Sequence, residues 1–176
     1  MKETPTTPPP DPLDRLTFLS PAAADATAVW RSPLERALAD APPGIRDISH
    51  TGKVEVRGEI AELRVKGTEA IWISAQRALV LCEYDETGAV MERLGDGFLA
   101  IDVTGALAGL EVQGAAVMRR LTDLDLDDLP APGSIAHVQA IVIRDEGETF
   151  RLFFPQEYGH YVAEVVVDAV EGLRPR

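Results

Sequence analysis

The fold is decided by residues 98–121, which read Phe-Leu-Ala-Ile-Asp-Val-Thr-Gly-Ala-Leu-Ala-Gly-Leu-Glu-Val-Gln-Gly-Ala-Ala-Val-Met-Arg-Arg-Leu. Two short apolar stretches, 98–103 and 107–112, predict two strands. After Gly114 the spacing of apolar residues changes to three and four, with two arginines on the other side, which predicts a helix over 115–121. Two strands leading through a glycine into a helix indicate a mixed α and β domain.

The chain before this stretch reads as further strands. Residues 53–57, Lys-Val-Glu-Val-Arg, alternate polar and apolar side chains as a half-buried strand does. The same pattern repeats over 60–66, and two apolar runs follow at 70–73 and 77–84. We expect four strands here and no helix.

The chain after residue 121 predicts a hairpin and a final helix. A turn-rich acidic segment, 122–133, precedes strands at 135–144 and 149–154, and Asp-Glu-Gly-Glu between them is typical of a turn. Apolar spacings of three and four predict a helix over 156–173, with a strand at 163–167 as the competing interpretation. The expected fold class is therefore α+β, with a mainly antiparallel sheet, a mid-chain helix and a C-terminal helix.

The distribution of proline and glycine divides the chain. Nine of the 13 prolines lie within residues 1–44, and all 14 glycines lie at or after Gly44. Residues 1–30 are predicted to form a proline-rich arm whose leucines and phenylalanine dock on a surface, and residues 31–176 to form the domain. At the start of the domain, Ser32 as N-cap and Pro33 in the first turn predict a short helix over 32–40.

The composition disfavours several partners. The net charge of −12 repels phosphate backbones and anionic lipid surfaces, so we expect neither nucleic acid nor a membrane as partner. No apolar run is long enough to span a bilayer, and the N-terminus shows no signal-peptide pattern. The lone cysteine, Cys82, lies in an apolar run, which indicates a buried structural thiol and is consistent with a reducing cytoplasm.

The stretch 98–121 resembles the opening motif of the folate-binding aminomethyltransferases, an Asp-Val-Ser/Thr strand, an apolar strand ending in glycine, and a helix rich in Ala and Leu. Residues 127–133, Asp-Asp-Leu-Pro-Ala-Pro-Gly, are similar to the segment before the next strand of that family. The order of motifs over residues 44–173, including the tryptophan-bearing run 71–81, resembles the gamma subunit of heterotetrameric sarcosine oxidase.

This chain departs from the family's sequence pattern at two places, and one of its own segments resembles the motif at 98–121. That family often has Pro-Asp-Glu-Trp after the tryptophan strand and Arg-Ser before the last helix, whereas this chain has Ser-Ala-Gln-Arg at 74–77 and Pro-Gln-Glu-Tyr-Gly at 155–159. Residues 44–58 look like a half-repeat of the motif at 98–121, but no helix pattern follows Gly58.

The residues themselves predict no catalytic or metal site in this chain. Asp145 and Glu146, which occupy the place of the aminomethyltransferase carboxylate, fall in a turn and read as solvated. His50, His137 and His160 have no second ligand at metal spacing, and the default for His160 is a packed or interfacial histidine. In the acidic segment, leucines alternate with four aspartates, Asp123, Asp125, Asp127 and Asp128. We expect the leucines to anchor this loop on the core and the aspartates to be solvated rather than to bind calcium.

The resemblance implies an accessory, noncatalytic cytoplasmic subunit of a complex that oxidatively demethylates sarcosine or a related N-methyl amine. Its partners would be larger, alpha- and beta-like oxidase subunits, and FAD, FMN, NAD and tetrahydrofolate would be bound in those partners rather than in this chain. The alternatives are a stand-alone folate-binding protein or one-carbon (aminomethyl) transferase, and a structural or regulatory module on a common scaffold.

Overall fold

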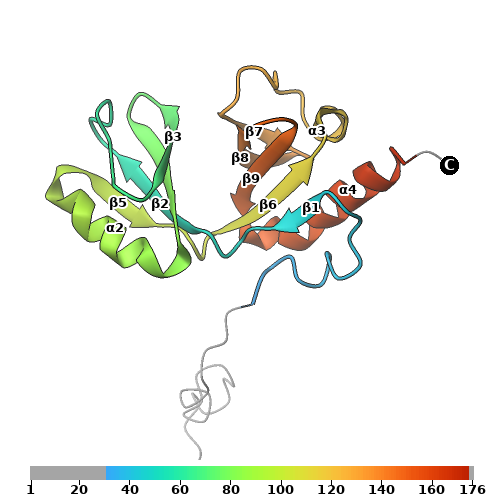
Figure 1. Ribbon diagram of the computed structural model, residues 1–176, viewed down its shortest axis with the longest axis horizontal. Coiled ribbons are helices and arrows are strands. Elements are labelled where there is room, and N and C mark those ends of the chain that lie inside the picture. Colours follow the sequence, from blue (N-terminus) through green and yellow to red (C-terminus); the bar gives the residue numbers. More distant parts are fainter. Residues whose placement is uncertain (1–30, 175–176) are drawn as a thin grey trace, which may run out of the picture. The chain divides into compact units, whose positions relative to one another are not determined.

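The computed structural model describes residues 31–174 and contains two antiparallel β-sheets with three α-helices (Figure 1). The predicted arm at 1–30 lies outside the described residues. From Ser32 onward the chain forms one compact unit. No described helix has the length and apolar character needed to cross a membrane. The α+β class and the antiparallel pairing are confirmed, but the strands divide between two sheets rather than one.

The first sheet has four strands in the order β3-β4-β2-β5. Its elements are β2 (Gly52–Arg57), β3 (Glu69–Ser74), β4 (Arg77–Cys82) and β5 (Leu99–Asp102), with 3-10 turns η3 (Tyr84–Glu86) and η4 (Gly95–Gly97) around helix α2 (Thr87–Leu94). Helix α2 lies beside β2 and β5 (Figure 1). Its Val90 and Leu94 pack on the strand residues Val54, Val56 and Val80, which forms one buried core.

The second sheet has five strands in the order β1-β6-β9-β8-β7. Its elements are β1 (Ile45–Asp47), β6 (Leu107–Gln113), β7 (Ala131–Ile135), β8 (Val138–Arg144) and β9 (Thr149–Pro155), together with α3 (Ala115–Leu121), η5 (Gln156–Tyr158) and α4 (Gly159–Glu171). Helices α3 and α4 cover one face of this sheet (Figure 1). Phe150 and Phe154 of β9 are completely buried there against residues such as Met118 and Val166.

Two similar segments cross from one sheet to the other. Residues 47–58 join β1 to β2, and residues 102–114 join β5 to β6; both begin with Asp-Ile-Ser or Asp-Val-Thr and end in Glu-Val-x-Gly. The Ser49 hydroxyl bonds both backbone groups of Gly109, at 3.1 and 3.3 Å. The Thr104 hydroxyl does the same to Lys53, at 2.9 and 3.3 Å.

This reciprocal bonding confirms the half-repeat that the sequence indicated at residues 44–58. No helix follows Gly58, as the sequence indicated; helix α2 comes only after β3 and β4 and was missed. At the crossing, a Cβ on Gly109 would lie 2.8 Å from the Ile48 carbonyl oxygen, so a residue without a side chain is required for the close approach.

The inner faces of the two sheets meet in a third core. Leu79 and Leu81 of β4 pack with Ile141, Ile143 and Phe153 of the five-stranded sheet. As a result, β2 is covered on both faces, by α2 on one side and by the second sheet on the other. The sequence predicted a half-buried strand here, and the structure shows buried polar positions at Lys53 and Glu55.

Two predicted elements are absent. Residues 33–40 form turns rather than a helix: the fully buried Leu34 anchors the segment in the core, and a run this short gains little from helical bonding alone. Residues 60–66 are not a strand, because Ile60 and Leu63 enter the same core. Positions three apart point to opposite faces of a strand, so the backbone must turn between them.

Other boundaries were wrong at a hairpin. The predicted strand 135–144 is interrupted at Ala136 and His137, whose φ angles are 49° and 67°. Residues 138–144 form β8, whereas Ile135 is the last residue of β7, which begins at Ala131 inside the segment predicted as turns. Such left-handed turns normally use Gly or Asn, so the sequence carried no turn signal. The hairpin at 145–148, the helix at 115–121 and the final helix are confirmed, and the alternative strand at 163–167 is wrong.

Candidate functional site

A lysine is fully buried where the chain crosses between the sheets. Lys53 has an exposed fraction of 0%, and its Nζ donates to the carbonyls of Ser49 at 2.8 Å and Thr51 at 2.7 Å. The ammonium also lies 5.9 Å from the centre of the Phe153 ring. Burial lowers the pKa of Lys53 to about 8, although the charge of Asp102 partly opposes this. Both carbonyls belong to the turn before β2, so the Lys53 ammonium holds this turn against the start of the strand.

Glu55, two residues along β2, is held between two arginines. Its Oε1 accepts from Arg57 Nε at 2.5 Å and its Oε2 from Arg77 at 2.7 Å. Burial by itself would raise the pKa of Glu55, but the hydrogen bonds from Arg77 and Arg57 outweigh it and hold the pKa below its usual range. Glu55 is therefore an ionised acceptor with both oxygens engaged and is a poor general base.

A pocket of about 200 Å³ opens beside this cluster, between the two sheets. Glu55 and Arg77 supply its charged part, and Val103, Leu107 and Phe153 belong to its apolar part. The Nε of Arg77 is buried and has no hydrogen-bond partner among the described residues. The pocket is smaller than the range of about 300–1,000 Å³ usual for small-molecule sites, so it does not fit a flavin or a dinucleotide.

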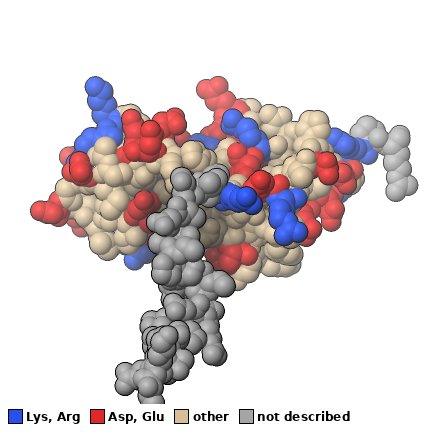
Figure 2. All heavy atoms as spheres, turned by 90° about the horizontal axis from the view of Figure 1, so that it is seen from below, with Lys and Arg blue, Asp and Glu red and all other residues tan. Residues whose placement is uncertain are grey.

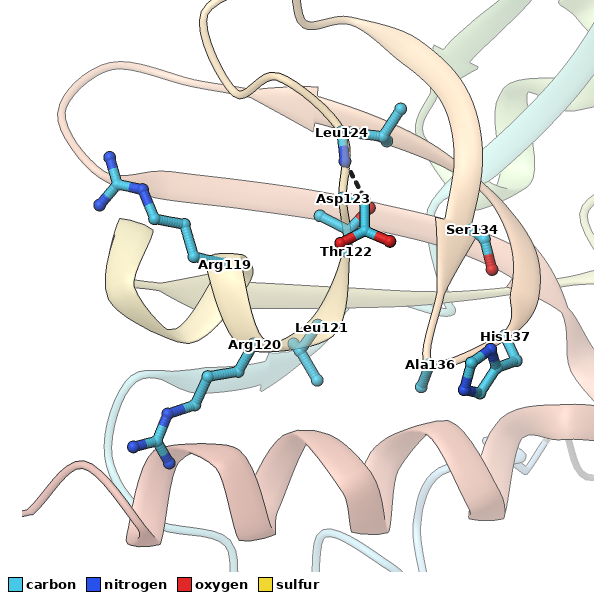
Figure 3. Close-up of a pocket in the computed structure, with 9 residues that line it drawn as sticks. All are labelled: Arg119, Arg120, Leu121, Thr122, Asp123, Leu124, Ser134, Ala136 and His137. Atoms are coloured by element: carbon cyan, nitrogen blue, oxygen red, sulfur yellow. Dashed lines mark hydrogen bonds between the residues drawn. The ribbon is translucent and has the colours of Figure 1, made fainter.

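A second pocket of about 370 Å³ lies between the end of α3 and the β7–β8 hairpin (Figure 3). The hairpin is held firmly: the Ala136 N–H donates to the Leu121 carbonyl at 2.8 Å, and the Tyr161 hydroxyl donates to the Ala136 carbonyl at 3.1 Å. Asp123, Ser134 and His137 all line the pocket. Among residues 31–174, however, no hydrogen bond joins these three side chains, so they do not form a charge-relay arrangement.

The two arginines of this second pocket do not converge on a ligand position. Figure 3 shows Arg119 and Arg120 extending away from the pocket, Arg120 toward the end of α4. Charge elsewhere is mixed as well: on the face drawn in Figure 2, acidic side chains are spread over the surface with basic ones among them. The face drawn in Figure 2 has no continuous basic surface of the kind that binds nucleic acid.

The carboxylates singled out from the sequence have different roles. Asp145 is not a solvated turn residue, because Arg151 donates to it at 2.6 and 2.7 Å and also to Glu69 of β3 at 2.8 Å. The hydrogen bonds that Arg151 donates to Glu69 and then to Asp145 raise the pKa of Arg151 above its usual range. This network joins β9 to β3 and so ties the two sheets together. Glu146 is exposed, as expected.

The acidic segment behaves as the sequence indicated. Leu126 is buried and Leu124 and Leu129 are partly buried against the core, while the aspartates stay exposed. Asp127 pairs with Arg144 at 2.7 Å. Among the residues that the structure describes, no group of three or more His, Cys, Asp or Glu side chains is arranged to hold a metal ion.

The histidines and the cysteine lie apart from both pockets, except for His137. His50 stacks on Tyr84 with ring centres 4.1 Å apart. His160 is exposed and 3.2 Å from Glu164, so it is not packed inside this chain, and the interfacial role expected as the alternative stays a prediction. Cys82 is half-buried rather than buried, and burial followed by the charge of Glu86 raises the pKa of its thiol, which disfavours a nucleophilic thiolate.

The residues that gather at the pocket between the sheets were not found from the sequence. Lys53, Glu55 and Arg57 were interpreted as the solvent face of a strand. The sequence indicated these residues only weakly. Three charged side chains that alternate with valines give the same pattern whether water or a second sheet covers their face of the strand. Arg77 appeared only as the start of an apolar run.

Solved structures share this fold at low sequence identity. A chain of the heterotetrameric sarcosine oxidase from Corynebacterium sp. U-96 in complex with pyrrole 2-carboxylate matches with a TM-score of 0.69 and 16% identity, over 85% of this chain and 98% of that one. The glycine cleavage system aminomethyltransferase T from Bartonella henselae matches with a TM-score of 0.53 and 17% identity, over 80% of this chain and 52% of that one. This chain therefore spans about half the length of that enzyme.

A further structure, the regulatory subunit of aspartate kinase from Thermus thermophilus, matches with a TM-score of 0.47 and 13% identity over 74% of this chain. No protein-family model matches the chain, and no curated protein sequence does. At these identities the likeness establishes the fold. The expected relation to the folate-binding aminomethyltransferases therefore holds for the architecture.

Proposed function

We propose that this chain is an accessory, noncatalytic subunit of a complex that oxidatively demethylates sarcosine or a related N-methyl amine. The observation that carries the proposal is the match in extent: the fold covers 98% of a sarcosine oxidase chain but 52% of an aminomethyltransferase. A chain that reproduces nearly all of one component of a complex, and about half of an aminomethyltransferase, fits a subunit better than an enzyme.

The chemistry of the described residues supports the noncatalytic part of the proposal. Lys53 and Glu55 are engaged by backbone carbonyls and arginines, and the pocket beside them is too small for a flavin or a dinucleotide. FAD, FMN, NAD and tetrahydrofolate would then be bound by larger, alpha- and beta-like subunits. This chain would contribute contact surface to that assembly.

The exposed apolar side chains support the subunit role. Large apolar residues remain at the surface of the described chain, namely Trp72, Tyr84, Leu99, Ile101, Tyr158, Tyr161 and Leu173. Exposed apolar groups of this size are what a protein interface would cover.

The test is to purify a tagged version of the full chain from its native host and record the visible spectrum and sarcosine-dependent oxygen consumption of the eluate. A yellow complex containing larger chains and oxidising sarcosine or another N-methyl amine is the expected result. A colourless single chain would overturn the proposal. Binding of tetrahydrofolate by that single chain would then establish the alternative, a stand-alone folate-binding protein or one-carbon transferase.

A further inference from the structure

One edge of the four-stranded sheet carries exposed apolar side chains. Strand β5 is the last strand of that sheet, and its Leu99 and Ile101 have exposed fractions of 58% and 39%. They lie directly opposite Arg57 and Glu55 of β2. Directly opposed residues of antiparallel strands share a face, so Leu99 and Ile101 lie on the inner face of the sheet.

The five-stranded sheet covers the inner face of the four-stranded sheet at β4 and β2 but not at β5. At β4, Leu79 and Leu81 are buried against the five-stranded sheet, and Glu55 of β2 has an exposed fraction of 8%. At β5, the five-stranded sheet no longer covers the row, and Ile101 is exposed. The pocket lined by Glu55 and Arg77 lies where the cover ends.

The backbone of β5 also has free bonding positions. The Val103 N–H donates to the Lys53 carbonyl at 2.9 Å. Because backbone bonding alternates along an antiparallel pair, Leu99 and Ile101 also bond to β2, whereas the N–H and C=O groups of Ala100 and Asp102 point away from the sheet. No strand of residues 31–174 pairs with that edge. An unprotected edge of this kind is a template for an added strand.

The charge beside the edge indicates what such a strand would carry. Arg57 and Arg77 are 54% and 42% exposed, and the one carboxylate between them, Glu55, has both oxygens occupied. Arg57 lies directly opposite Leu99 and is the arginine nearer to β5, because Arg77 lies one strand further away on β4. A second copy of this chain would bring a further net charge of −12, which opposes self-association.

We propose that an extended segment of a different chain, the partner subunit, pairs with β5 and extends the four-stranded sheet. Its apolar side chains cover Leu99 and Ile101, and one of its carboxylates lies beside Arg57. The assignment of this partner to an oxidase complex rests on the proposed function. The surface itself follows from the register, the exposed fractions and the exposed arginine opposite Leu99.

The test uses the full-length chain and a short synthetic peptide of alternating valine and threonine with one central glutamate; the control peptide has lysine in its place. Amide hydrogen exchange is measured on the chain with and without peptide. We expect exchange at Ala100 and Asp102 to slow by about tenfold or more, because their N–H groups gain acceptors. The glutamate peptide should bind about tenfold more tightly than the lysine peptide.

Variants separate this surface from nonspecific adhesion. Ile101→Lys should weaken binding of the glutamate peptide by about tenfold. Leu173→Ser, which changes an exposed apolar residue elsewhere, should leave it unchanged. Arg57→Gln should remove the preference for glutamate over lysine while retaining the slowed exchange at β5.

Unchanged exchange at Ala100 and Asp102 under saturating peptide would overturn the inference, as would equal binding of the two peptides. A chain that sediments as a dimer and dissociates on Ile101→Lys substitution would identify the occupant as a second copy and would also overturn it. If the peptide protects β5 but no flavin-containing complex is found, the proposed function fails and the surface stands. If a flavin-containing complex is found but the peptide does not protect β5, the proposed function stands and the proposed binding surface is wrong.

Discussion

Replacing Lys53 by Met should change how the stability of this protein depends on pH. The lysine is fully buried, and burial lowers its pKa from 10.5 to about 8. Below about pH 8 the folded and unfolded chains both carry the proton. Between about pH 8 and the unfolded value the unfolded chain binds it more strongly, so the free energy of unfolding rises with pH across this window.

The size of the effect follows from the two pKa values. With each pKa unit corresponding to about 1.4 kcal/mol, a change from 10.5 to about 8 gives about 3 kcal/mol between neutral pH and the top of the window. We expect the wild-type chain to gain about this much more than Lys53→Met as the pH rises. Comparing the two chains removes the contribution of groups that titrate in both.

The assay is urea unfolding, followed by circular dichroism, of wild type, Lys53→Met and the control Lys66→Met at several values between about pH 7 and pH 10. Lys66 is exposed, so its variant should follow wild type. Parallel curves for wild type and Lys53→Met would refute the reasoning, because they would mean that the Lys53 ammonium is not more costly to bury than the neutral amine.

Three further outcomes are expected. Gly109→Ala should destabilise the chain by about 2 kcal/mol or more, because the added Cβ would lie 2.8 Å from the Ile48 carbonyl oxygen. The control Gly97→Ala meets open space and should stay within about 0.5 kcal/mol of wild type. Equal melting temperatures for the two variants would contradict this prediction. Ser49→Ala should cost about 1–3 kcal/mol in urea unfolding, since both buried backbone groups of Gly109 lose a partner. Deleting residues 1–30 should weaken assembly with partner subunits while leaving a cooperative melt of the body; loss of that melt would place the arm in the core.

The sequence predicted elements whose side-chain period was strong and local. The helix at 115–121 agrees with α3 at both ends, and the turn at 145–148 joins β8 to β9 as expected. Each has a clear local cause, a change to helical spacing after Gly114 and a glycine in an acidic turn. Helix α2 had such a signal too, with buried residues at Thr87, Val90 and Leu94, but Gly88 beside the first of them obscured it.

Other elements depended on contacts between distant segments. Residues 60–66 alternate like a strand, yet Ile60 and Leu63 must enter one core. Ala136 and His137 adopt left-handed conformations because Leu121 and Tyr161 hold the hairpin from two other elements. No local preference for a turn exists there, so the sequence predicted a continuous strand.

The sequence by itself determined the α+β class and most of the strands, and it indicated a likeness between residues 44–58 and the motif at 98–121. The division into two sheets, the burial of Lys53 and Glu55, and the exposed edge at β5 were decided by the tertiary structure. The physical reason is that alternating polar and apolar side chains along a strand indicate only that the two faces of the strand have different surroundings. Whether water, a helix or a second sheet covers each face depends on segments far away in the chain.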